Sequence, residues 1–141
     1  MGSEMCIRDS VLSDRGNIFD AAGLAAIAAL RTTTVPAERF DVGEDHPLPV
    51  NGCPIIASFT RVGGRFVYDA NEQEEIGGAE RIHITLGDEG HLHSLQKGLK
   101  GVFSPSEFAE ILNEAQTHCT CLLYTSPSPR DLSTSRMPSS A

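Results

Sequence analysis

The hydrophobic pattern places an apolar helix near the start of the chain. Residues 18–33 (IFDAAGLAAIAALRTT) are apolar on almost every side of a helix, and Asn17 or Asp20 can begin it. Residues 11–17 are predicted to end a strand and lead into a turn. The helix is predicted to be buried on several sides. Because the rest of the chain is too short to supply that cover, the pattern favours a fragment of a larger domain.

A polar connection and four strand-like runs follow this helix. Residues 35–47 are rich in Pro, Gly and charged residues, and they indicate a connecting loop. Two hairpins are predicted after it, the first around Gly63-Gly64 and the second around residues 88–90. A charged loop is predicted between the hairpins at residues 70–80. The four predicted strands are residues 53–62, 65–70, 81–87 and 91–98.

A second helix is predicted over residues 104–118. Ser104 stands three residues before Glu107, which is the spacing of a capping box, and Pro105 suits the first helical position. An apolar stripe follows at helical spacing. The order of helix, loop, four strands and helix predicts an α+β fold whose sheet packs on helices, without internal repeats. The stripe consists of Phe108, Ile111, Leu112 and Ala115.

The two ends of the chain share an unusual relation at the level of DNA. Residues 5–10 (MCIRDS) and 121–126 (CLLYTS) can be encoded by opposite strands of one short DNA. That DNA resembles the transposase mosaic end used to prepare sequencing libraries, and the flanking residues fit the adjoining adapter. We therefore expect residues 1–10 and 121–141 to be adapter-derived, without a domain, and the latter to be a disordered tail. A natural disordered tail is the alternative.

Charge and cysteine content narrow the choice of partners and compartment. The chain has 11 basic and 19 acidic residues and a net charge of −8, so its bulk charge does not attract nucleic acid. The adapter hypothesis removes Cys6 and Cys121 and leaves Cys53 and Cys119. With no signal peptide recognised, we expect a reducing, cytoplasmic compartment. The longest apolar run, residues 21–30, is too short to span a bilayer.

The histidines and cysteines do not form a complete metal-binding pattern. Residues 118–121 (HCTC) resemble part of a zinc site, but a closed site needs four ligands and Cys121 falls in the adapter region. His91 and His93 share one face of a predicted strand and can bind metal or titrate near neutrality, but a solvent-facing pair is favoured. His83 lies between two isoleucines and is predicted to make a cross-strand contact.

Two polar segments are candidates for chemistry. Residues 68–75 (YDANEQEE) bring together four carboxylates, which can hold Mg²⁺ or raise one another's pKa. A solvated acidic loop is the favoured interpretation. Residues 96–101 (QKGLKG) place two lysines among glycines before a helix, an arrangement that can hold a phosphate and that also occurs in ordinary turns. The sequence has no Walker-type loop, nucleophile elbow or dinucleotide fingerprint.

Four segments, taken in order, resemble the RNase PH family: GNIFDAAGLAAIAAL, LPVNGCPIIASF, YDANEQEE and LQKGLKGVFSPSEF. Within that family they are similar to the non-catalytic RNase PH-like subunit of the archaeal exosome. The resemblance implies a ribonuclease PH-like α+β fold. It places the end of the first domain at residues 11–34 and a truncated second domain at residues 48–120.

The same resemblance bears on catalysis. In this family, phosphate attacks the terminal phosphodiester of RNA and releases a nucleoside diphosphate. Catalytic members resemble this chain at Asp69, Glu74 and Glu75, but they place an essential aspartate where this chain has Arg81. An arginine is always cationic and accepts no hydrogen bond, and Glu80 is expected to face the opposite side of the strand. The resemblance therefore implies no catalytic and no metal-binding residue in this chain, and it leaves the RNA-binding residues unknown.

The resemblance further implies a hexameric ring that degrades RNA 3′-to-5′. The partners it implies are a catalytic RNase PH-like subunit, cap subunits and RNA, with no membrane. Phosphate and Mg²⁺ would act at the partner's active site. Two alternatives stay open, a catalytically active exoribonuclease subunit and a small α+β interaction domain. Residues 11–120 alone are expected to be poorly soluble or molten, because the apolar helix lacks its cover.

Overall fold

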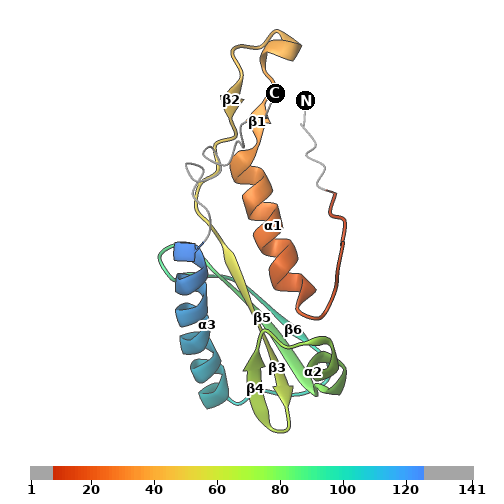
Figure 1. The fold of residues 1–141 in the computed structure, drawn as a ribbon. Coiled ribbons are helices and arrows are strands. Elements are labelled where there is room, and N and C mark those ends of the chain that lie inside the picture. The colour runs from red at the N-terminus through yellow and green to blue at the C-terminus, as the bar shows by residue number, and fades with distance from the viewer. Residues whose placement is uncertain (1–7, 126–141) are drawn as a thin grey trace.

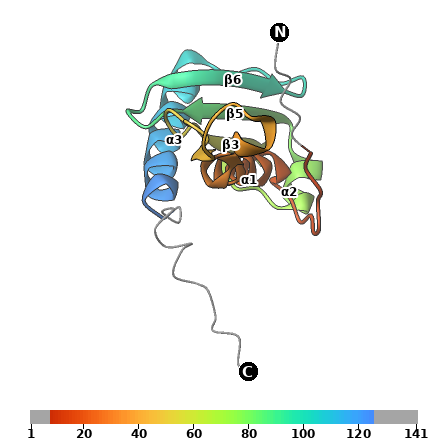
Figure 2. The ribbon, with the colours of Figure 1, turned by 90° about the horizontal axis from the view of Figure 1, so that it is seen from above.

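The computed structural model describes residues 8–125, with side chains described as far as Leu123. The chain forms a four-stranded antiparallel sheet with α1 on one face and α3 on the other (Figures 1 and 2). A short two-stranded sheet lies beyond the end of α1. The elements are α1 (Ile18–Thr32), β1 (Thr34–Val35), η1 (Glu38–Phe40), β2 (His46–Pro47), β3 (Ile55–Val62), β4 (Arg65–Tyr68), α2 (Glu72–Gly77), β5 (Glu80–Leu86), β6 (Leu92–Gly98) and α3 (Pro105–Thr125).

The larger sheet has the strand order β4-β3-β5-β6. Both predicted hairpins are confirmed, with Gly63 and Gly64 in the first turn at positive φ, a conformation that glycine adopts without strain. The pairing of β3 with β5 sets Ser58 opposite His83 and Phe59 opposite Ile82. Because side chains alternate along a strand, these two pairs lie on opposite faces of the sheet.

The hydrophobic core lies between the sheet and α3. The predicted capping box is confirmed, since the backbone N–H of Glu107 donates to Ser104 Oγ and the N–H of Ser104 donates to Glu107 Oε2, 2.8 Å away. This capping box fixes where α3 begins, and two residues of the apolar stripe, Ile111 and Ala115, are buried against the sheet. The buried residues of the core are Cys53, Ile55, Ala57, Phe59, Ile82, Ile84, Leu86, Ile111, Ala115 and Cys119.

The opposite face of the sheet is covered more thinly, by α1. Gly23 of α1 lies directly on Ile56, so that a Cβ at this position would come within 2.6 Å of the Ile56 Cδ1 atom. Ile18, Phe19 and Leu24 remain roughly two-fifths exposed, and no residue of α1 is fully buried. The helix is therefore covered on its sheet side only, which agrees with the expectation that the rest of the chain is too short to supply the cover predicted for its other sides.

Two further predictions of local structure are corrected. Residues 11–17 form no strand, because no described strand lies beside them to accept and donate ladder hydrogen bonds. The segment predicted as a charged loop, residues 70–80, contains the helix α2. Asn71 caps it by accepting from the N–H of Glu74, while the Glu74 carboxylate accepts from the N–H of Asn71. This capping box was present in the sequence and was not recognised.

The predicted adapter-derived ends, residues 1–10 and 121–141, are only partly within the described residues. α3 continues to Thr125, past the predicted start of the tail at residue 121. Residues 1–7 and 126–141, which belong to the predicted adapter-derived ends, lie outside the described residues, so the predicted division into domains stays a prediction. None of the helices within residues 8–125 combines the length and the apolar character that a membrane crossing requires.

We predict that the isolated chain binds the dye ANS and has poor solubility, because α1 leaves an apolar surface in water. Replacing Ile18 and Leu24 with Gln should lower the ANS fluorescence and raise the solubility. The matched control is Glu110→Gln on the exposed surface of α3, which should change neither. ANS fluorescence that is equal for all three proteins would contradict the prediction.

Candidate functional site

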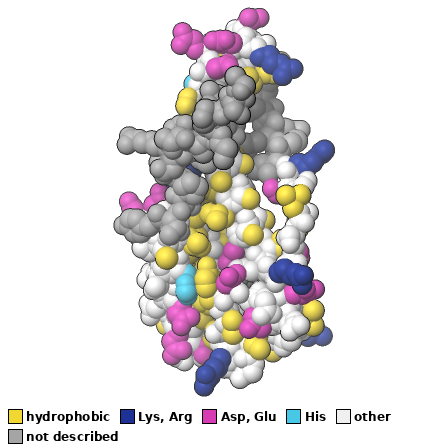
Figure 3. All heavy atoms as spheres, viewed as in Figure 1, with side chains coloured by type: hydrophobic (Ala, Val, Ile, Leu, Met, Phe, Trp, Pro, Cys, Tyr) yellow, Lys and Arg dark blue, Asp and Glu magenta, His cyan; other side chains and the backbone are white. Residues whose placement is uncertain are grey.

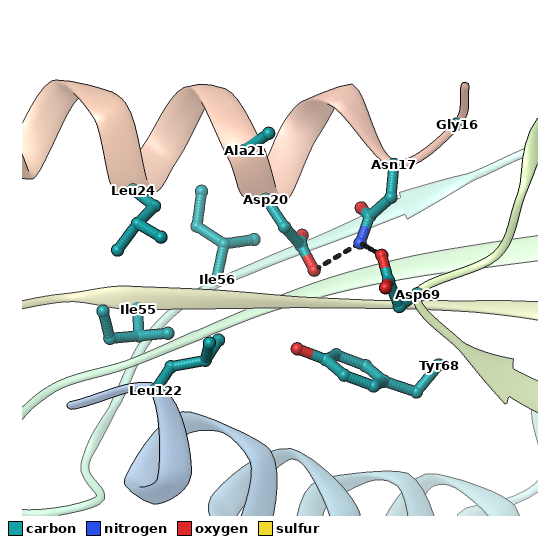
Figure 4. A pocket seen from close by; sticks show the side chains of 10 residues that line it. All are labelled: Gly16, Asn17, Asp20, Ala21, Leu24, Ile55, Ile56, Tyr68, Asp69 and Leu122. Carbon is teal, nitrogen blue, oxygen red and sulfur yellow. Dashed lines mark hydrogen bonds between the residues drawn. The ribbon is translucent and has the colours of Figure 1, made fainter. Parts of the chain in front are cut away.

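Five polar residues gather between α1 and the sheet, and we call them the polar cluster. Asn17 and Asp20 come from the start of α1, Ser58 from the middle of β3, Asp69 from the residue after β4, and His83 from β5. Figure 4 shows Asn17, Asp20 and Asp69 turned toward one another across the gap between helix and strand. Residues that are far apart in the sequence thus meet on the α1 face of the sheet.

Asn17 links both carboxylates of the cluster. Its Nδ2 atom donates to Asp20 Oδ2 at 3.0 Å and to Asp69 Oδ1 at 2.8 Å, and its backbone N–H donates to Glu75 Oε1 at 3.1 Å. Asn17 takes the left-handed conformation, with φ of 50°, which asparagine tolerates better than most residues. Of the two predicted N-cap residues, Asn17 and Asp20, it is Asn17 that begins α1, but its side chain makes no capping hydrogen bond. The side-chain amide instead joins α1 to Asp69 at the end of β4, while the backbone N–H of Asn17 joins it to Glu75 of α2.

A chain of hydrogen bonds connects Asp20 to His83 through Ser58. The backbone N–H of Ser58 donates to Asp20 Oδ2 at 3.0 Å, and its hydroxyl also donates to the Asp20 carboxylate. The same hydroxyl lies 2.6 Å from His83 Nδ1. Since the Ser58 proton is directed to Asp20, we assign the Nδ1 proton to His83 as the donor of this bond. The predicted cross-strand contact of His83 is thereby confirmed.

Burial changes the titration of both ends of this chain. Burial raises the pKa of Asp20, although the hydrogen bonds from Ser58 and Asn17 oppose the change. Burial lowers the pKa of His83, against the attraction of the Asp20 carboxylate. Phe19 adds to this burial, because its ring stacks on the His83 ring with centroids 4.3 Å apart. The neutral imidazole is therefore the favoured form in the folded chain near neutrality.

Glu80 and Arg81 lie on opposite faces of β5, as predicted. Glu80 points to the α3 face, where it pairs with Arg61. The Arg81 guanidinium lies on the α1 face, 3.7 Å from Glu75 Oε2, which is the distance of an ion pair. Glu75 is thus held by a guanidinium and by the Asn17 N–H. Within the acidic segment 68–75, Glu75 forms the ion pair with Arg81, and the positive charge of the guanidinium balances its negative charge.

The other candidate residues do not form sites among the described residues. His91 and His93 are exposed, which confirms the predicted solvent-facing pair. His118 stacks on Tyr68 with centroids 3.8 Å apart, and burial raises the pKa of the Cys119 thiol to about 11. The Cys119 thiol is buried and donates to the Ile55 carbonyl at 3.6 Å. Lys97 donates to the Leu99 carbonyl at 3.0 Å. No group of three metal-binding side chains converges within residues 8–125.

An open pocket of about 250 Å³ lies beside the polar cluster. One wall is polar and includes Asn17, Asp20 and Asp69, while the other wall is aliphatic, with Leu24 and Ile55 among its residues (Figure 4). The Asp20 carboxylate and the Asn17 amide nitrogen are already bonded within the chain. This arrangement fixes α1 on the sheet and presents no free acid or base with a ligand-like geometry.

Comparisons with known proteins identify relatives of this chain. The chain is 39% identical over 102 residues to the exosome complex component Rrp42 of Archaeoglobus fulgidus, a match that covers 72% of this chain and 39% of that protein. The chain is homologous to part of archaeal Rrp42. The chain spans about two fifths of the length of the curated Rrp42 proteins it matches. No protein-family model matches the chain.

Solved structures agree with the Rrp42 match. A chain of the Archaeoglobus fulgidus exosome with RNA bound to the active site has a TM-score of 0.74 and 37% identity, over 80% of this chain and 44% of that chain. A chain of an archaeal exosome core also gives 0.74, with 38% identity over 79% of this chain and 45% of that chain. The observed α+β fold, an antiparallel sheet packed with helices, is therefore similar to the matching part of these exosome chains.

We predict that Ser58→Ala destabilises the chain by about 1–3 kcal/mol, because it leaves Asp20 and His83 buried without their shared hydroxyl. Ser94→Ala is the matched control. Ser94 also lies opposite β5 and bonds Thr85 at 2.8 Å, but it is exposed, so a change within about 0.5 kcal/mol is expected. Urea unfolding followed by circular dichroism measures both. Equal effects of the two substitutions would refute a structural role for the cluster.

We predict that the ring of His83 titrates below its ordinary pKa of 6.5. Because the unfolded chain then takes up this proton first, the stability that neutral His83 contributes is complete above pH 6.5 and decreases as the pH falls below it. Asp20 acts in the opposite sense, since lowering the pH through its raised pKa relieves a buried charge. NMR titration of the histidine rings measures the midpoint, and His83→Gln identifies the signal. A midpoint at or above 6.5 would rule the prediction out.

Proposed function

We propose that this chain is part of a non-catalytic subunit of an exosome ring that degrades RNA 3′-to-5′ by phosphorolysis. The observation that carries the proposal is Arg81, whose guanidinium lies 3.7 Å from Glu75 on the α1 face of the sheet. The resemblance to the RNase PH family puts an essential aspartate of the catalytic members at this position. This chain keeps the neighbouring acidic residues Asp69, Glu74 and Glu75, but it has an arginine at position 81 in place of that aspartate.

The charges at this position do not fit a divalent cation. A magnesium site takes oxygen ligands, usually carboxylates, and Glu75 already faces a permanent positive charge. Bringing Mg²⁺ to the same carboxylate would set two cations against each other. Glu80 does not compensate, because it is directed to the other face and pairs with Arg61 there. An arginine also provides no proton at neutral pH for a leaving 3′-oxygen.

The rest of the assignment follows the homology with Rrp42. We infer that residues 11–34 end the first RNase PH domain and that residues 48–120 form the truncated second one. The subunit would alternate with a catalytic RNase PH-like partner that holds phosphate and Mg²⁺, and it would meet cap subunits and RNA in the cytoplasm. The Archaeoglobus fulgidus exosome, to which the chain is similar, was solved with RNA at its active site, which supports this placement.

Two other functions are less well supported. A catalytically active exoribonuclease would need a carboxylate where Arg81 stands. An unrelated interaction domain would not explain 39% identity and a TM-score of 0.74 with exosome proteins over most of the chain. Both alternatives give different outcomes in a reconstituted ring.

We predict that a full-length version of this protein shows no phosphorolysis alone and that its ring with the catalytic partner is active. Replacing the partner's active-site aspartate with asparagine should abolish the phosphate-dependent release of nucleoside diphosphates, measured by thin-layer chromatography of labelled RNA products.

The control for that experiment keeps the partner's variant and changes this chain. Residual release that disappears with Asp69→Asn or Glu80→Gln would show that this chain carries an active site and would overturn the proposal. Ser94→Ala, on the exposed edge strand β6, is the control. If it leaves the residual release of nucleoside diphosphates unchanged, the loss is specific to Asp69 or Glu80.

A further inference from the structure

The segment that leads from β2 into β3 contains the one Asn-Gly pair of the chain. Asn51 and Gly52 lie within residues 48–54, which form neither helix nor strand and run from β2 down to the start of β3 (Figure 1). Both residues are exposed. Asparagine is a thermolabile residue, because the backbone nitrogen of the next residue can attack its side-chain carbonyl carbon. Glycine at the next position favours this attack, since it has no Cβ to hinder the approach.

The reacting groups of this pair are not held by hydrogen bonds. Within residues 8–125, neither the Gly52 N–H nor the Asn51 side chain has a hydrogen-bond partner. The next backbone N–H along the chain is held, because Cys53 donates to Asp88 Oδ1 at 2.6 Å. Gly52 itself has a φ of 81°, which glycine adopts without strain. The Gly52 nitrogen can therefore turn toward the Asn51 side chain without breaking a hydrogen bond.

The other three asparagines of the chain are in different surroundings, and none of them is followed by glycine. Asn17 is buried, and its side-chain nitrogen is held by two carboxylates. The side-chain oxygen of Asn71 accepts two backbone N–H groups at the start of α2. Asn113 lies inside α3, where the helical hydrogen bonds hold the backbone that would have to turn. Sequence and structure thus both single out Asn51.

We propose that Asn51 is a site of spontaneous modification by water, which converts its side-chain amide to a carboxylate. The Gly52 nitrogen forms a bond to the Asn51 Cγ atom, while the bond from Cγ to the side-chain nitrogen breaks. Ammonia leaves with the former Gly52 proton, and a five-membered cyclic imide remains. Water then adds to either imide carbonyl carbon and breaks its bond to the ring nitrogen, which regains a proton. The products are aspartate and isoaspartate, no atom is oxidised or reduced, and the step is independent of the proposed function.

The modification weakens the attachment of β3 at its start. A Cβ at Gly52 would lie 3.9 Å from Asp88 Oδ2, so the new carboxylate at the adjacent position 51 comes near the Asp88 carboxylate and repels it. The chain already has a net charge of −8, and Figure 3 shows Asp and Glu side chains spread over one face of the molecule. Isoaspartate also inserts an extra carbon into the main chain just before Cys53. Both products therefore disturb the hydrogen bond from Cys53 to Asp88.

The test incubates the whole chain in warm buffer at neutral pH and follows each asparagine by peptide mapping with mass spectrometry. Two products, aspartate and isoaspartate, should accumulate at Asn51, and the other three asparagines should stay intact over the same time. Asn51→Gln should abolish this signal, because glutamine would have to form a less favourable six-membered ring. The matched control is Asn113→Gln, an exposed position in α3, which should leave the modification of Asn51 unchanged.

Two outcomes of this incubation would overturn the proposal. One is modification of Asn113 as fast as that of Asn51, and the other is modification of Asn51 far more slowly than in a peptide of residues 48–54, which would show that the fold holds the segment. The effect on β3 is measured by urea unfolding, in which the isoaspartate form and Asn51→Asp should have lower midpoints than the unmodified chain. Asn113→Asp carries the same change of charge and should lower the midpoint less. Equal midpoints for Asn51→Asp, the isoaspartate form and the unmodified chain would refute the weakening of β3.

Discussion

The pairing of β3 with β5 decides what each face of this molecule contains. The register sets Ser58 opposite His83, Thr60 opposite Arg81 and Arg61 opposite Glu80. A shift by one residue would exchange the two faces and bring polar groups into the core. The register is held by the row of buried side chains that includes Phe59 and Ile82, since these meet α3 only in this alignment. The position of Arg81 is therefore a consequence of core packing.

The two faces of the sheet are held by different kinds of interaction. α3 is attached by apolar burial along several turns, which is strong and not directional. α1 is attached at one end by the hydrogen bonds of Asn17 and Asp20 and in its middle by the contact of Gly23 with Ile56. This difference explains why α1 has apolar residues left exposed. A helix with this composition fits a protein in which its outer surface is also covered, in agreement with relatives of which this chain matches only about two fifths.

The parts that sequence reasoning found are those with local signals. Gly63-Gly64 marks a turn, and Ser104 with Glu107 marks a helix start, each within a few residues. α2 was missed although Asn71 and Glu74 have the same spacing, because the acidic composition of the segment favoured a loop. The bond between Asp20 and Ser58 joins residues 38 positions apart, and no spacing rule connects them. The shape of residues 34–47 could not be predicted either, since it depends on the Asp45 side chain, which accepts a hydrogen bond from the N–H of Glu38 across the turn.

The ion pair between Arg81 and Glu75 has consequences for the elements around it. A carboxylate at position 81 would need a cation beside Glu75 to offset the repulsion between two neighbouring acids. An arginine makes the site neutral without any bound ion, and it keeps α2 fixed against β5 through Glu75. Asn17 also bonds Glu75, so this neutral site supports the attachment of α1. At its other end, α1 leads into the paired strands β1 and β2. The ion pair of Arg81 with Glu75 thus supports the attachment of both α2 and α1 to the sheet.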